Sequence, residues 1–230
     1  MARLHTRFRS ASPTPWGRGT AFGLAAFILA TTGGCADRLE ASQPVVHAPT
    51  DSVADWSRNH AQPYGIPERA LRSYAYAAYR VQKDGCSLGW PTIAALGAVL
   101  SDHGRAAGSS VSEDGKTTVP LRGLNLLRPD HPVAVPDTDQ GRIDGNPTQD
   151  VPVGPMQIMP SRWEQYAATV EPQTPPEVDS MDDASLTVAR LMCSKGNLNS
   201  PDGWAGAISE VDPDQDFVKA VHAKAEEYSR

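Results

Sequence analysis

The chain alternates between stretches in which apolar residues recur every three or four positions and stretches rich in glycine and proline. Recurrence at three and four positions places these residues on one face of a helix. The pattern predicts six helices, which begin near Gly65, Trp90, Pro160, Asp182, Ser200 and Asp212.

The helix that begins at Trp90 is the centre of this pattern. Pro91 follows at a first-turn position, where a missing N–H costs nothing. One stripe of the helix holds the apolar or small residues at positions i, i+3, i+4 and i+7, namely Ile93, Leu96, Gly97 and Leu100. Residues 101–104 are expected to end the helix, with Gly104 as its C-terminal cap.

Residues 105–153 are the least regular part of the chain, and so long an insert is typical of a segment that lines a cleft. Residues 119–127 and 131–135 are candidate short strands. Residues 137–145 begin as Asp-x-Asp, which is one element of a calcium loop, but the glutamate that closes an EF-hand loop is missing. The sequence therefore favours an acidic turn and predicts no metal and no other cofactor.

The N-terminus has the pattern of an export signal. Residues 1–34 hold four arginines and no acidic residue, and their apolar run is shorter than the roughly 20 residues that span a bilayer. Small residues before Cys35 are typical of a lipoprotein cleavage site, with Cys35 lipidated; ordinary signal-peptidase cleavage nearby is the alternative. Residues 35–62 are polar and predict a tether, and residues 63–230 predict one folded domain.

The net charge and the remaining cysteines bear on the binding partners and the compartment of the protein. The formal net charge is −6, and removing the four N-terminal arginines makes it −10. So acidic a chain is a poor partner for nucleic acid or anionic lipid. If Cys35 carries lipid, Cys86 and Cys193 are left either as a disulfide outside the cytosol or as two buried thiols.

Two stretches resemble signatures of one enzyme family. Residues 90–104 are similar to a segment of the secreted lytic murein transglycosylases of actinobacteria, which runs from Gly-Trp-Pro to Glu-Ser-x-His-Gly. Residues 153–163 are similar to the family motif Gly-Pro-Met-Gln-Phe-Ile-Pro-Ser-Thr-Trp. The resemblance extends over about residues 65–228. It implies a mainly α (α+β) fold: a lysozyme-like transglycosylase domain with a small irregular β insert.

The resemblance also implies a substrate site and a cysteine bridge. Met156 and Gln157, beside Pro155, would offer an apolar face and an amide to a sugar ring. His103 either hydrogen-bonds sugar or closes its own loop. The two remaining cysteines lie where the family has a pair, so the resemblance favours the disulfide.

The chain departs from the family at its catalytic position. The family's glutamate protonates the leaving oxygen between N-acetylmuramic acid and N-acetylglucosamine, and then acts as the base that closes a 1,6-anhydro ring. Leu100 stands at that position, while Val211 and Asp212 replace the tyrosine and asparagine that face the acid. Glu210 and Asp102 are the fallback acids, although Asp102 would lie about 200° round the helix from position 100.

Three hypotheses follow. The first is an exported protein that binds peptidoglycan glycan strands and has lost most or all cleavage. The second is an active peptidoglycan lyase with a displaced acid, and the third is a lipoprotein scaffold for an envelope protein partner. In each, the protein lies at the outer face of the cytoplasmic membrane, anchored through lipid on Cys35.

Overall fold

The structure is a computed structural model that describes residues 50–130 and 135–230. The predicted export signal, the lipidation of Cys35, the first part of the predicted tether and most of the strand predicted at residues 131–135 lie outside the described residues. Across the described ranges, every helix is too short or too polar to cross a membrane.

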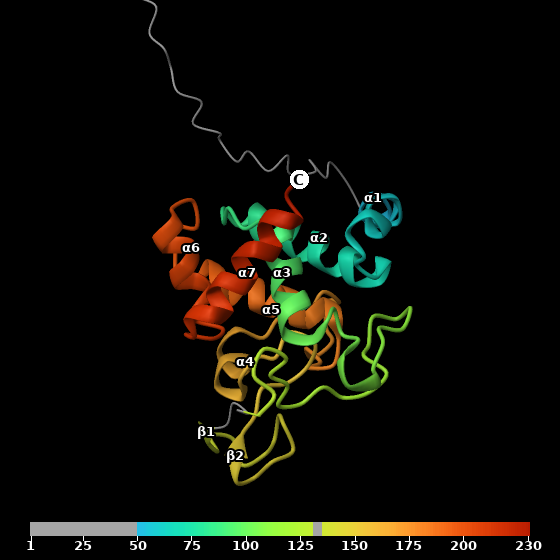
Figure 1. The fold of residues 1–230 in the computed structure, drawn as a ribbon. Coiled ribbons are helices and arrows are strands. Elements are labelled where there is room, and N and C mark those ends of the chain that lie inside the picture. The colour runs from blue at the N-terminus through green and yellow to red at the C-terminus, as the bar shows by residue number, and fades with distance from the viewer. Residues whose placement is uncertain (1–49, 131–134) are drawn as a thin grey trace, which may run out of the picture. The chain divides into compact units, whose positions relative to one another are not determined.

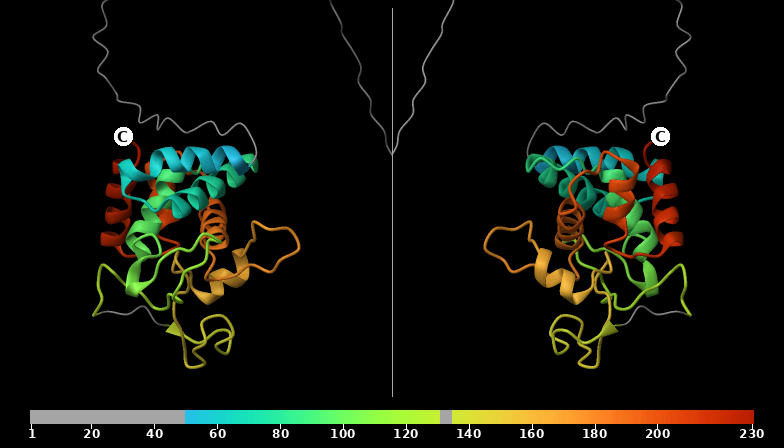
Figure 2. Two further views of the ribbon diagram at one scale, coloured as in Figure 1. Left: turned by 90° about the vertical axis from the view of Figure 1, so that its right-hand side faces the viewer. Right: turned by 90° about the vertical axis from the view of Figure 1, so that its left-hand side faces the viewer.

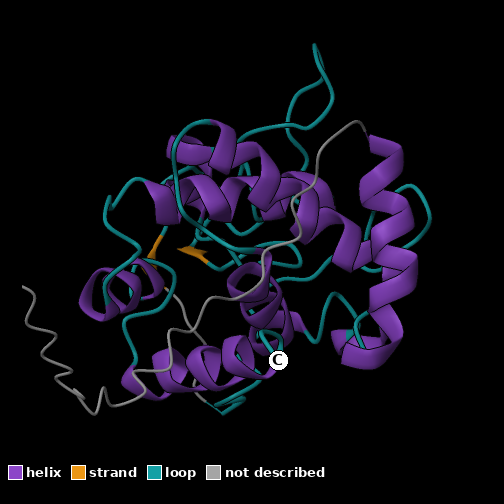
Figure 3. Cartoon of the chain, turned by 90° about the horizontal axis from the view of Figure 1, so that it is seen from above, coloured by secondary structure: helices purple, strands orange, loops and turns teal. Residues whose placement is uncertain are grey.

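The described chain is mainly helical, as predicted. It forms seven α-helices and one two-stranded antiparallel sheet. The helices are α1 (Thr50–Tyr64), α2 (Glu68–Lys83), α3 (Trp90–Ser101), α4 (Pro160–Tyr166), α5 (Met181–Cys193), α6 (Pro201–Ile208) and α7 (Gln215–Glu227), and the strands are β1 (Val135–Pro136) and β2 (Gln149–Asp150). Most helices gather at one end of the domain, and β1 and β2 lie beyond α4 at the other end (Figure 1). Seen from above, almost all of the regular structure is helical (Figure 3).

Helix α3 lies at the centre of the core. Every residue from Trp90 to Gly97 is buried, and the helix packs against α2, α5 and α7. A helix that is covered on all sides has to be apolar or small around its whole circumference. Position 97 has no room for a side chain, because a Cβ atom on Gly97 would lie 2.1 Å from the hydroxyl oxygen of Tyr74.

Helix α1 lies in a region that the sequence analysis predicts to be a tether. Residues 50–64 form a helix that lies beside α2 (Figure 2), so the prediction of a tether over residues 35–62 is wrong for its second half. Val53, Ser57 and Ala61 recur every four residues and are buried, which gives α1 one inward face. Trp56 packs its ring against the edge of Trp90.

The predicted strands are also corrected. Residues 119–127 form no strand, and their ladder contact is an isolated bridge between Arg122 and Val153. The hairpin instead pairs Val135 with Asp150 and Pro136 with Gln149. Of the second predicted strand, Val135 is the one residue that falls within the described residues, and it lies in the sheet.

Side-chain caps fix the starts of the last three helices. Ser180 accepts from the backbone N–H of Asp183, and Ser200 caps α6 in the same way. Asp214 caps α7 by accepting two backbone N–H groups. Such caps satisfy amides that have no partner within the helix, and they place the starts within three residues of the predicted positions.

A disulfide joins Cys86, in the loop between α2 and α3, to Cys193 at the end of α5. The sulfur atoms are bonded, and the two Cα atoms lie 5.8 Å apart. The predicted bridge is confirmed, and the alternative of two buried thiols is wrong. The bridge links two positions that are 107 residues apart in sequence.

Candidate functional site

A cavity of about 440 Å³ opens beside the C-terminal end of α3. Its walls come from the end of α3, residues 124–127, the start of α4 and the segment between α6 and α7. Four leucines line it, namely Leu100, Leu124, Leu126 and Leu127. Its volume and mainly apolar lining are those of a site for a small ligand or for one segment of a polymer.

Leu100 lies on the last turn of α3 and lines this cavity. The helix ends directly after it, because Asp102 adopts the left-handed conformation and caps the helix, where Gly104 was the predicted cap. Ser101 then ties this end to the second signature, since its hydroxyl donates to the carbonyl of Pro155 at 2.6 Å. Sequence position 100 is thus held at the cavity wall.

Only one of the three predicted sugar contacts in the second signature lines the cavity. Gln157 does so, but its amide is engaged within the protein: Nε2 donates to the carbonyl of Gly154 at 2.7 Å, and Oε1 accepts from the N–H of Leu124 at 2.6 Å. Met156 is fully buried in the core and Pro155 is buried, so neither offers a face to a ligand. Met159, which the sequence analysis did not single out, lines the cavity instead.

His103 is a structural residue in this arrangement. It is 3% exposed and does not line the cavity. Nδ1 lies 3.2 Å from the hydroxyl of Tyr74 and Nε2 lies 3.1 Å from the hydroxyl of Tyr228. Both ring nitrogens are therefore occupied, and of the two interpretations the geometry matches the loop-closing one.

Tyr74, His103 and Tyr228 form a hydrogen-bonded network, and its burial shifts the pKa values of these residues. Burial is the main cause that lowers the pKa of His103 to about 4, and the nearby positive charge of Arg105 lowers it further. Burial also raises the pKa of Tyr74, and it raises the pKa of Tyr228 to about 12. At neutral pH the network is uncharged, and it joins α2, the end of α3 and the end of α7.

The two fallback acids lie in different places. Glu210 lines the cavity, but its Oε2 accepts from Arg162 at 2.8 Å and its Oε1 pairs with Lys195 at 2.7 Å. Asp102 does not line the cavity; its side chain is 54% exposed and pairs with Arg105. The structure therefore brings Glu210 together with Leu100, and it does not bring Asp102 there.

Several cavity residues were not identified from the sequence. The apolar run Leu124, Leu126 and Leu127 is the clearest, because Leu126 and Leu127 are each 45% exposed. Three leucines within four residues of an otherwise polar and irregular segment are a signal that the segment covers or lines something. Arg162 gives no such signal, since an arginine in the first turn of a helix is ordinary.

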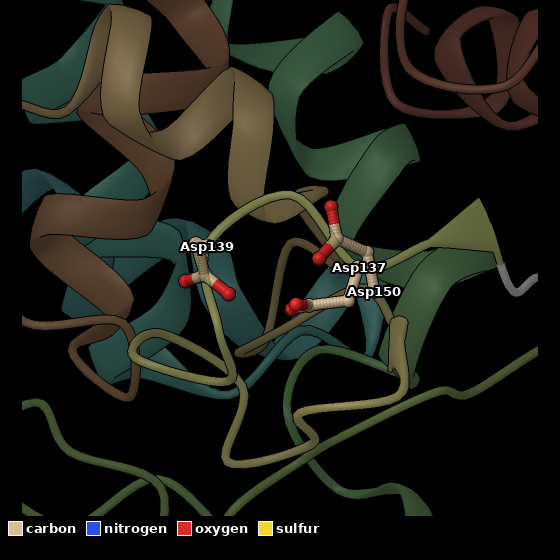
Figure 4. Close-up of side chains that lie close together, drawn as sticks. All are labelled: Asp137, Asp139 and Asp150. Carbon is tan, nitrogen blue, oxygen red and sulfur yellow. The ribbon is translucent and has the colours of Figure 1, made fainter.

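The predicted acidic turn brings three carboxylates together. Oxygen atoms of Asp137, Asp139 and Asp150 lie within 4.8 Å of one another, and Figure 4 shows the three side chains around one loop. They are the residues that could share a cation. Each already accepts hydrogen bonds: Asp139 from the N–H of Ile143 at 2.7 Å, Asp150 from that of Thr138 at 3.0 Å, and Asp137 from two N–H groups of the turn. The aspartates thus hold the backbone of the turn.

Comparisons of the chain with models of protein families, with curated proteins and with solved structures give no match. The likeness to lytic murein transglycosylases therefore stays an expectation from the motifs.

Proposed function

We propose that the protein binds peptidoglycan glycan strands in the cavity beside Leu100 and does not cleave them. The observation that carries the proposal is the place of Leu100, at the wall of the cavity and at the family's acid position. Cleavage needs a carboxylic acid that protonates the leaving oxygen, and general acid–base help of this kind is worth about 10²–10⁴ in rate. A leucine side chain has no proton to donate.

The surroundings of Glu210 count against a displaced acid. A general acid carries a proton on one carboxyl oxygen, and both oxygens of Glu210 are occupied by cationic groups. Asp102 faces Arg105 away from the cavity lining. An active lyase would have to break the Glu210 pairs first, so the non-cleaving function is the better supported of the two.

The proposal includes a lysozyme-like domain in an exported lipoprotein. In support, the described chain is mainly helical, a helix ends at the catalytic position, and a small sheet lies close to the cavity. The Cys86–Cys193 disulfide favours an oxidising compartment outside the cytosol. Lipid on Cys35 would anchor the domain at the outer face of the cytoplasmic membrane.

One observation favours a second candidate, a scaffold for an envelope protein. Leu126, Leu127 and Val135 are large apolar side chains that are exposed at the cavity, and such patches also mark protein interfaces. A sugar ring and a protein segment would both cover these side chains. The two candidates differ in whether purified peptidoglycan, free of protein, is bound.

Co-sedimentation with protein-free peptidoglycan tests the proposal. We expect the purified protein to sediment with the insoluble polymer. We expect Leu127→Asp to raise the apparent Kd by at least about tenfold, since burying a leucine is worth roughly 1.5–3 kcal/mol. Val119→Asp is the matched control, because Val119 is 41% exposed but does not line the cavity. If the protein stays in the supernatant, the scaffold replaces glycan binding as the proposed function; equal effects of both substitutions would place the glycan elsewhere.

A further inference from the structure

We infer that Arg162 binds a carboxylate of the ligand, so that the cavity selects glycan strands whose muramic acid carboxylates are free. This inference rests on the proposed function and names the form of the strand. The free form arises when the stem peptides are removed, because the peptide is joined to the lactyl group of muramic acid through an amide. An intact strand presents that amide, which is neutral, and a stripped strand presents a carboxylate at every second sugar.

Arg162 has unused hydrogen-bond donors at the cavity. It lies in the first turn of α4, lines the cavity, and has a side chain that is 40% exposed. One nitrogen, Nη2, donates to Glu210. Within the described residues Nε and Nη1 of Arg162 make no hydrogen bond. A guanidinium has five N–H donors in a fixed fork, and the fork matches a carboxylate.

The charge around Arg162 also favours an anion. Arg162, Lys195 and Glu210 form one ion-pair cluster that carries a net charge of +1. The pair between Arg162 and Glu210 shows that a carboxylate fits against this guanidinium at 2.8 Å. A ligand that covers the leucine and valine side chains of the cavity would exclude water from them, which strengthens a charge-assisted hydrogen bond.

A negatively charged group lies on a different wall of the cavity from Arg162. This separation of charge sets the orientation in which a glycan strand binds. Asp212 lines the cavity and Asp214 follows it, and both pair with Arg128, so this group carries a net charge of −1. A carboxylate would be repelled there, whereas sugar hydroxyl and amide N–H groups would donate to it. The carboxylate of the ligand is therefore directed to α4, and its hydrogen-bond donors are directed to Asp212.

The test measures binding of the purified full-length protein to three insoluble polymers. The first is intact peptidoglycan, the second is peptidoglycan from which an amidase has removed the stem peptides, and the third is chitin, which has the same linkage without lactyl groups. We expect the apparent Kd for the stripped polymer to be about tenfold lower than for the other two, in line with one hydrogen bond between charged groups.

Two substitutions separate ligand binding from a merely structural ion pair. Arg162→Gln should abolish the tenfold preference, so that the stripped polymer is bound no more tightly than the intact one. Glu210→Gln should increase the preference, because it removes the internal carboxylate that competes for the guanidinium. A structural pair would instead make both substitutions weaken binding to all three polymers alike. Arg142→Gln is the control, since Arg142 pairs with Glu164 and does not line the cavity.

The outcomes distinguish this inference from the function on which it rests. If the protein binds intact and stripped peptidoglycan equally well, or if Arg162→Gln keeps the preference, the role of Arg162 is overturned while glycan binding stands. If none of the three polymers is bound, glycan binding and the role of Arg162 are overturned together. A preference for the stripped polymer that Arg162→Gln removes and Glu210→Gln increases supports both.

Discussion

Replacement of both Cys86 and Cys193 by alanine is expected to lower the free energy of unfolding by about 2–5 kcal/mol. The bridge joins two cysteines 107 residues apart in sequence and links the α2–α3 loop to the end of α5. Such a bond restricts the unfolded chain, and long loops are restricted most. Denaturant unfolding of the variant and of the parent, followed by circular dichroism, measures the difference.

The native protein unfolded with a reducing agent present is the matched comparison, because reduction breaks the bond without changing any side-chain carbon. The reduced protein and the double variant should lose similar amounts of stability. A loss below about 0.5 kcal/mol, the range of ordinary surface substitutions, would mean that the bridge contributes nothing to the fold.

Acidification from pH 6.5 to pH 4 is expected to cost the fold about 3 kcal/mol through His103 alone. Its pKa is about 4 in the folded protein, against 6.5 for an ordinary histidine. In this interval the unfolded chain binds the proton and the folded chain does not, so stability is full above pH 6.5 and falls as the pH drops toward 4. Each pH unit in the interval is worth about 1.4 kcal/mol.

Other groups also titrate in acid, so the informative quantity is the difference between variants. We expect His103→Gln to be less stable than the parent at pH 7 and to lose less stability between pH 6.5 and pH 4. His222→Gln is the control, since the side chain of His222 is 58% exposed and lies on the surface of α7. Parallel stability curves for the parent and His103→Gln would contradict the buried, uncharged His103.

Helices α2, α3, α5, α6 and α7 are predictable because each has a stripe of apolar residues and a clear start or stop signal. In α2, Leu71, Tyr74 and Val81 follow the helical period and are all buried. The disulfide is predictable in a similar way, because few cysteines leave few pairings. The helices depend on residues that are close in sequence, which a single chain displays directly.

Helix α1 and the sheet are less accessible to sequence reasoning. The inward residues of α1 are separated by polar ones, and Pro63 lies inside the helix, so its order depends on the surface of α2 that it covers. Strands β1 and β2 have two residues each, too few for an alternating pattern. Asp150 of β2 supports their pairing, because it accepts from the backbone N–H of Thr138 in the acidic turn between the strands.

The candidate site likewise contains features that the sequence predicts and features that it does not. The place of Leu100 near the end of α3 follows from the helical pattern, whereas its place at a cavity is expected only from the family resemblance. The burial of Met156 does not, because it depends on a tight turn in which Gln157 adopts a φ of 43°, a conformation that glutamine rarely takes. The turn sends Met156 into the core and leaves Met159 at the cavity. Arg162 and the exposed leucines join the site only through contacts distant in sequence.

Mass spectrometry of peptidoglycan incubated with the protein tests the central claim most directly. The protein should sediment with the polymer, and the soluble and digested fractions should contain no 1,6-anhydromuramic ends beyond those of a protein-free sample. Accumulation of such ends with time, abolished by Glu210→Ala or by Asp102→Ala, would contradict the claim and would identify the acid that replaces the glutamate missing at Leu100.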